Sequence, residues 1–170
     1  MNITLHRTLM VCVLAGALAL ATALVAIKDV SAAPSPALAS GATQISGLGF
    51  YGTCDNPEGE GADYAIEMIG SLDGCLYTFF EEEDTQSSPS GTYREWGTEI
   101  FVASYGSGTF MTTYRFEAKY NLAGEEIFGR CQHPIIKGSG TGVFEGVTGI
   151  LLFKDDIEAG NFPYRGHLRY

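Results

Sequence analysis

A strict two-residue alternation of side chains over residues 109–120 restricts the fold more than any other feature of the chain. Successive side chains of a β-strand point to opposite faces, so this alternation is typical of a strand with one buried and one solvated face. The largely polar face carries Met111, Thr113, Arg115, Glu117 and Lys119. The face predicted to be buried carries Phe110, Thr112, Tyr114, Phe116, Ala118 and Tyr120.

Seven further segments have the composition of strands. They are rich in Tyr, Phe, Thr, Ile and Val, which suit a pleated surface. No segment of the chain after the N-terminal region has a helical period. Glycine, of which the chain has 22, recurs between them as a turn residue, and Asp73-Gly74 supplies a tight hairpin turn. The predicted strands span residues 44–52, 63–70, 75–82, 92–103, 126–137, 149–155 and 162–170.

Eight short strands joined by short turns predict an all-β domain, either an antiparallel barrel or a sandwich. We favour a small eight-stranded barrel of the calycin-like type. The chain ends at Tyr170 inside its last strand, and pairing of that strand with the first would leave no open sheet edge.

Residues 1–39 have the features of a secretory signal peptide. A short basic start with His6 and Arg7 precedes the apolar run Leu9–Ile27, and Ala37-Leu38-Ala39 forms a cleavage site before Ser40. The chain is therefore expected to be exported, to the medium or the cell envelope, with residues 40–170 as one barrel domain. The alternative is an uncleaved anchor, because the apolar run is close to the roughly 20 residues that span a bilayer. No second apolar run follows, so no stable membrane span is expected after cleavage.

The chain is acidic, with a formal net charge of −10. Nucleic acids are therefore not expected as partners. Part of the charge lies in the run Glu81–Asp84, which we interpret as a solvated loop mouth, because it lacks the alternating ligands and central glycine of a calcium loop. No metal or cofactor is expected, since the histidines are scattered and neither a C-x-x-C pair nor a phosphate loop occurs.

Three of the cysteines follow the predicted cleavage site: Cys54, Cys75 and Cys131. In an exported protein they predict one disulfide and one free thiol. Simple hairpins would place Cys54 and Cys75 at opposite ends of the sheet. Cys131 is therefore expected to pair with Cys75 or with Cys54, and Cys75 is preferred.

Residues 138–156 carry the sequence GSGTGVFEGVTGILLFKDD. This stretch resembles the signature of the allene oxide cyclase and dirigent-like barrel superfamily, and Tyr164-Arg165-Gly166 resembles the last strand of those domains. The resemblance implies an eight-stranded antiparallel barrel with a central cavity, and dimers or trimers. Plant members cyclise an epoxide fatty acid or steer the coupling of phenolic radicals. The matching residues are structural: Phe144 is a core anchor, and Gly146 and Gly149 allow a sharp corner.

The segment around Cys131 is a candidate site, because Arg130, Gln132 and His133 add a cation, an amide and an imidazole to an apolar strand. Cys131 and His133 are predicted to share one face, and Arg130 the other. The alternative is that Cys131 is half of a disulfide and His133 an ordinary buried residue.

Glu95 and Glu99 share a face with Tyr93 and Phe101. If this face looks into the barrel, burial would raise the pKa values of the two carboxyl groups and suit them to acid–base chemistry. The opposite arrangement buries Trp96, Ile100 and Val102 and leaves both glutamates in solvent. The candidate catalytic residues are thus Glu95, Glu99 and His133, and the candidate ligand contacts are Tyr93, Phe101, Tyr114 and Arg130.

Three functions fit the sequence. We favour an exported barrel that binds a small hydrophobic or phenolic molecule without changing it. A cyclase, isomerase or dirigent-like steering protein would use the cavity carboxylates, but no Ser-His-Asp order or other recognised catalytic arrangement is present. A structural or interaction protein of the cell envelope would have a fully packed barrel. A homo-oligomer is compatible with all three.

Overall fold

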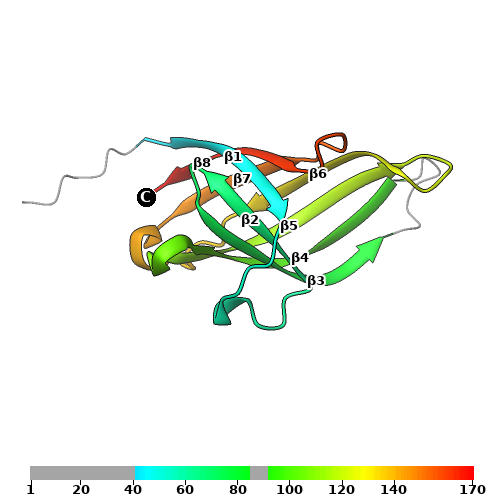
Figure 1. Cartoon of the computed structure of the whole chain (residues 1–170). Coiled ribbons are helices and arrows are strands. Elements are labelled where there is room, and N and C mark those ends of the chain that lie inside the picture. The colour runs from blue at the N-terminus through cyan, green and yellow to red at the C-terminus, as the bar shows by residue number, and fades with distance from the viewer. Residues whose placement is uncertain (1–40, 85–91) are drawn as a thin grey trace, which may run out of the picture. The chain divides into compact units, whose positions relative to one another are not determined.

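The computed structural model describes residues 41–84 and 92–170, which form a closed barrel of eight antiparallel strands (Figure 1). The strands are β1 (Thr43–Tyr51), β2 (Tyr64–Gly70), β3 (Gly74–Asp84), β4 (Thr92–Ala103), β5 (Thr109–Tyr120), β6 (Glu126–Pro134), β7 (Thr148–Lys154) and β8 (Phe162–Arg169). Three 3-10 turns accompany them: η1 (Pro57–Gly59), η2 (Ser104–Gly106) and η3 (Gly142–Phe144). The predicted all-β class and antiparallel eight-stranded barrel are confirmed. The predicted signal peptide lies outside the described residues.

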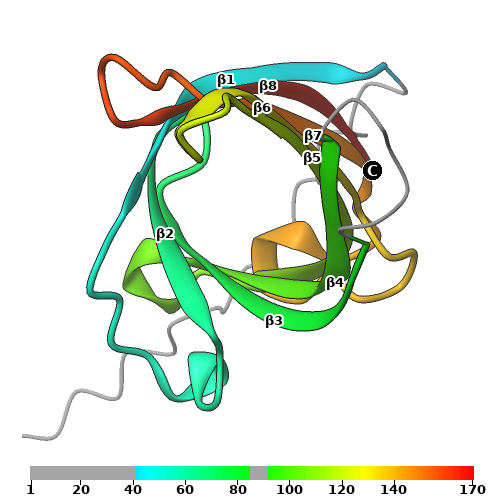
Figure 2. The same ribbon diagram turned by 90° about the vertical axis from the view of Figure 1, so that its right-hand side faces the viewer.

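Each strand pairs with its neighbours in sequence, and β8 returns to pair with β1 (Figure 2). Ile45 of β1 lies opposite Gly166 of β8, so the predicted closure by the last strand is confirmed. The largest difference in strand bounds is at β6, which ends at Pro134 rather than residue 137. Proline has no N–H with which to continue the ladder. Among the described residues, no helix is long and apolar enough to cross a membrane.

The interior face of β4 is the one that carries the glutamates. Phe101 and Glu99 lie opposite Phe110 and Thr112 of β5, and all four side chains are buried. The arrangement that turns Trp96, Ile100 and Val102 toward the core is therefore wrong. These apolar residues lie on the outer face, part of which the β1–β2 connection covers: its turn η1 packs against β3 and β4.

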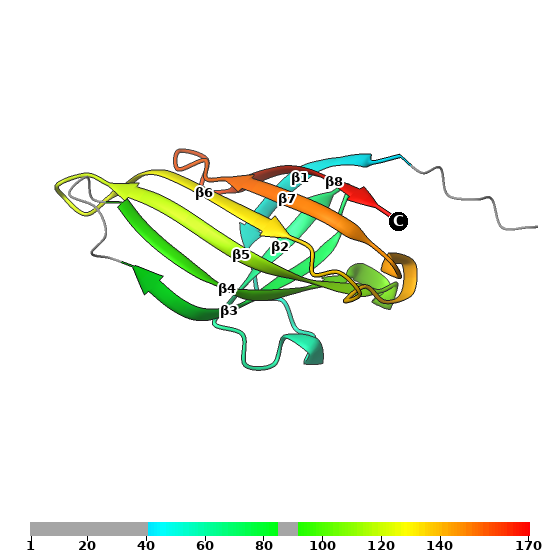
Figure 3. The same cartoon turned by 180° about the vertical axis from the view of Figure 1, so that it is seen from behind.

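The 3-10 turn η3 closes one end of the barrel (Figure 3). Its Phe144 is buried and meets Phe101 and Phe110 edge-on, with ring centroids 5.8 Å and 5.1 Å apart. Gly142 begins the turn with a φ of 58°, and a Cβ there would collide with the backbone of Ser107. The stretch that resembles the barrel superfamily thus builds this closed end.

The disulfide joins Cys54 to Cys75, whose Cα atoms are 6.1 Å apart, so the predicted pairing of Cys131 with Cys75 or Cys54 is wrong. That prediction assumed a simple hairpin after β1. Instead residues 52–63 form a long connection that folds back beside β3 (Figure 1), where Cys75 points to the outer face. Among the described residues, Cys131 is the free cysteine, and it is buried.

Candidate functional site

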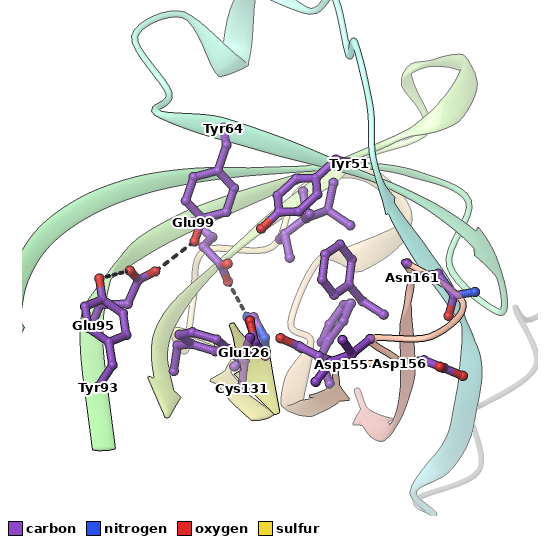
Figure 4. Close-up of a pocket in the computed structure, with 18 of the residues that line it drawn as sticks. Tyr51, Tyr64, Tyr93, Glu95, Glu99, Glu126, Cys131, Asp155, Asp156 and Asn161 are labelled. Atoms are coloured by element: carbon purple, nitrogen blue, oxygen red, sulfur yellow. Dashed lines mark hydrogen bonds and ion pairs between the residues drawn. The ribbon is translucent and has the colours of Figure 1, made fainter. Parts of the chain in front are cut away.

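A cavity of about 450 Å³ occupies the end of the barrel opposite η3 (Figure 4). All eight strands contribute to its wall, together with the β7–β8 connection. The interior of the barrel is therefore divided: aromatic and aliphatic side chains fill the end that η3 closes, and the other end is hollow. This volume suits one small molecule.

Aromatic rings form much of the cavity wall. Tyr51 meets Phe162 edge-on with ring centroids 4.8 Å apart, and Tyr93 meets Phe116 at 6.2 Å. Tyr51 is 71% exposed although it lines the cavity, which places it at the mouth. The lining rings are Tyr51, Tyr64, Tyr93, Phe116, Tyr120, Phe153 and Phe162.

Glu95 of β4 accepts hydrogen bonds from tyrosine hydroxyls on three strands. Its carboxylate lies 3.0 Å from Tyr64 Oη, 2.5 Å from Tyr93 Oη and 3.2 Å from Tyr114 Oη. Burial, followed by the neighbouring Glu95, raises the pKa values of all three tyrosines, so their hydroxyls stay protonated and donate. The cluster fixes this carboxylate as an acceptor whose partners come from the protein itself.

Glu99 lies deeper and forms a dyad with His133. Its Oε2 is 2.6 Å from His133 Nδ1 and 2.6 Å from Thr112 Oγ1, and its Oε1 accepts from Thr78 Oγ1 at 3.1 Å. Glu99 is 2% exposed and His133 4%. The imidazole packs against Phe153, with ring centroids 4.6 Å apart, and its Nε2 has no hydrogen-bond partner. A dyad with one free ring nitrogen has the arrangement needed to give or take a proton.

A second pair of carboxyl groups lies nearer the mouth. Glu126 begins β6 and Asp155 follows β7, and the two side chains meet over Gly129. A Cβ at Gly129 would collide with both carboxyl groups. Burial, a hydrogen bond with Glu126 and the charge of Glu126 raise the pKa of Asp155 to about 7. One proton is therefore held in this pair near neutral pH.

Asp155→Asn is expected to raise the stability of the barrel above neutral pH and to flatten the pH dependence of its melting temperature. The folded pKa of Asp155, about 7, lies above its ordinary value of 3.8, so the folded state holds this proton more tightly than the unfolded state. The stability that the proton contributes is fully present below about pH 4 and is lost as the pH rises through about 7.

Melting curves of the wild type and of Asp155→Asn between about pH 4 and about pH 8 test this expectation. Glu158→Gln is the control, because it removes one negative charge from an exposed position in the same connection. If the melting temperatures of the wild type and of Asp155→Asn change in parallel over this pH range, the Glu126–Asp155 pair does not hold the proton that this expectation assigns to it.

The structure brings three sequence candidates together and separates others. Glu95, Glu99 and His133 line one cavity, as does Tyr93, and Tyr114 stands behind Glu95. Phe101 is fully buried in the stack at the closed end and does not line the cavity.

Arg130 lies on the outer face, where its Nη2 is 2.6 Å from Glu117 Oε2. Neither Arg130 nor Phe101 lines the cavity. Arg130 belongs instead to a surface cluster in which Arg94 and Arg115 also approach Glu117. Hydrogen bonding to Arg130 is the main cause that lowers the pKa of Glu117.

The sequence analysis missed Glu126 and Asp155. Both fall at the ends of predicted strands, and only the pairing of β6 with β7 brings them side by side. Gly129 is the one local signal, because a glycine inside a strand can mark a close approach of other groups.

Comparisons of the chain with known protein families, curated proteins and solved structures give no match. The eight-stranded antiparallel barrel agrees with the architecture of the allene oxide cyclase and dirigent-like superfamily, and membership of it remains a prediction.

Proposed function

We propose that this chain is an exported barrel that binds one small, largely apolar or phenolic molecule in the cavity at its open end. The single observation that carries the proposal is the cavity of about 450 Å³, with aromatic rings along its wall and hydrogen-bonding groups at its base. Pockets of this kind, apolar with a few converging polar groups, are the usual form of small-molecule sites. A barrel that served only as a packed scaffold would have no reason to keep this volume open.

The wild-type protein is expected to bind one equivalent of N-phenyl-1-naphthylamine, an uncharged aromatic probe, with a rise and blue shift of its fluorescence. Ile157→Trp places a bulky ring at the cavity mouth and is expected to weaken this binding by about tenfold. Val143→Trp is the matched control, because Val143 is 60% exposed on η3 at the opposite end. No saturable binding to the wild type, or equal weakening by both variants, counts against the cavity as the site.

The Glu99–His133 dyad supports a second candidate, an acid–base catalyst of the cyclase or isomerase type. His133 Nε2 is unpartnered, and its ring lines the cavity. If this candidate holds, the protein will open the epoxide ring of an epoxide fatty acid supplied as its methyl ester. Chiral chromatography will then show an excess of one product enantiomer. His133→Gln should abolish this excess and leave probe binding within about twofold of the wild type. A racemic product with the wild type would leave binding as the function.

A further inference from the structure

Two of the three unsatisfied polar atoms of the cavity are acceptor oxygens, and the third is a ring nitrogen of histidine. Glu126 Oε1, His133 Nε2 and Asn161 Oδ1 are buried without a partner, and all three residues line the cavity. Nε2 is an acceptor when Nδ1 carries the hydrogen that faces Glu99. The hydroxyls of Tyr64 and Tyr93 already donate to Glu95. A ligand that completes the cavity must therefore bring N–H or O–H donors.

The cavity is also strongly acidic. Its lining includes Glu95, Glu99, Glu126, Asp155 and Asp156 and contains no lysine or arginine. The acidic run at residues 81–84, of which residues 81–83 are exposed, ends β3 at the same end of the barrel. Low-dielectric walls focus the field of such a cluster and concentrate ligands of opposite charge.

The Glu126–Asp155 pair is the point where a positive charge fits best. Glu95 and Glu99 have donors from the protein, whereas Glu126 and Asp155 face one another and Glu126 Oε1 has no donor. A cation between the two carboxyl groups would take the place of the shared proton and donate a charge-assisted hydrogen bond to each of them.

Tyr51 and Tyr120 line the same cavity as this pair, and burial, together with the charges of Glu126 and Asp155, raises the pKa values of both tyrosines. Aromatic faces attract cations. No group of three or more His, Cys, Asp or Glu side chains in residues 41–84 and 92–170 is placed to hold a metal ion. An organic cation satisfies both features of the cavity, because its charged nitrogen meets the carboxylates and its apolar body meets the rings.

We infer, building on the proposed binding function, that the ligand is an organic cation: a protonated amine on an aromatic or apolar body. The ammonium group lies between Glu126 and Asp155 near the mouth, and the body packs against the tyrosine and phenylalanine rings of the wall. A fatty acid, which the family resemblance implies as a substrate, carries a carboxylate that the same groups repel.

Binding of such a cation is linked to pH through Asp155, which must lose its proton to form the ion pair. The titratable groups that face Asp155 are Tyr51 of β1, Tyr120 of β5, and Glu126 and Cys131 of β6. None of these side chains can carry a positive charge. Lys154, next to Asp155 in the sequence, is exposed on the outer face. No lysine or arginine lines the cavity to compete for the site, so the amine takes the place of the shared proton.

The test uses three probes with one ring system and different charges: tryptamine as the cation, tryptophol as the neutral analogue and indole-3-propionate as the anion. Isothermal titration at about pH 8 is expected to show tryptamine binding at least about tenfold more tightly than tryptophol, with no saturable binding of indole-3-propionate. Tryptamine affinity should fall about thirtyfold at about pH 5.5, where Asp155 is protonated, while tryptophol affinity stays constant.

The double variant Glu126→Gln/Asp155→Asn should bind tryptamine no better than tryptophol, and a far-ultraviolet circular dichroism spectrum like that of the wild type shows that it is folded. Glu158→Gln is the matched control, with tryptamine binding unchanged. Equal affinity of the wild type for tryptamine and tryptophol overturns the cation inference and leaves the binding function intact. The same conclusion follows if tryptamine does not bind and N-phenyl-1-naphthylamine does. Failure of all four probes overturns both.

Discussion

Replacement of Phe144 by alanine is expected to lower the free energy of unfolding by about 3 to 5 kcal/mol, the usual cost of removing a fully packed phenylalanine. Phe144 is 7% exposed and contacts the stacked rings of Phe101 and Phe110, both of which are fully buried. Loss of the ring leaves a void where η3 closes the barrel, and the stiff strands around it cannot collapse to fill the space.

Urea denaturation followed by circular dichroism measures this effect. Val143→Ala is the matched control: Val143 belongs to the same 3-10 turn, but it is 60% exposed, and its truncation should change stability by less than about 0.5 kcal/mol. A Phe144→Ala protein that unfolds at the same urea concentration as Val143→Ala would show that the aromatic stack does not stabilise the closed end.

Removal of the disulfide by Cys54→Ala/Cys75→Ala is expected to cost about 3 kcal/mol, because the bond closes a loop of 21 residues and restricts the unfolded chain. The same change frees residues 52–63 from the outer face of β3, where Gly59 packs on Tyr77. Denaturation of the wild type under reducing conditions should give the midpoint of the double variant, and reductant should leave the variant unchanged.

Thiol titration of the unfolded, unreduced protein provides an independent check of the pairing. Cys54→Ala should add one free thiol, that of Cys75, whereas Cys131→Ser should remove one. If Cys131→Ser instead adds a free thiol, Cys131 forms a disulfide in the wild type. In the folded protein the Cys131 thiol should react slowly, because burial, with the nearby charges of Glu99 and Glu95, raises its pKa.

The closed end of the barrel is packed with side chains, and the open end holds the cavity with its acidic groups. The stretch that resembles allene oxide cyclase and dirigent-like domains supplies Phe144 at the closed end and, after β7, Asp155 at the open end. Its glycines and its phenylalanine serve packing. Its penultimate residue, Asp155, reaches the cavity, where we propose that it meets the ligand.

The sequence by itself determined the architecture. The alternation in residues 109–120 depends on a local property, the two-residue period of a strand, and the same face of β5 turns into the barrel, with Tyr120 exposed at its end. The last predicted strand pairs with the first as expected, because an unpaired edge would leave backbone groups without partners. The alternation in residues 126–134 also predicted that Cys131 and His133 share one face and that Arg130 lies on the other, and the structure turns the first of these faces inward.

Only the tertiary structure decided which groups form the site. Both faces of β4 carry apolar residues, so the local pattern of β4 could not show that Glu95 and Glu99 face inward, a choice made by the registers with β3 and β5. The meeting of Glu126 with Asp155 depends on how β6 pairs with β7, and the Cys54–Cys75 bond depends on a loop that returns across an outer face. Contacts between distant segments follow from strand register and loop path, which local side-chain periodicity does not encode.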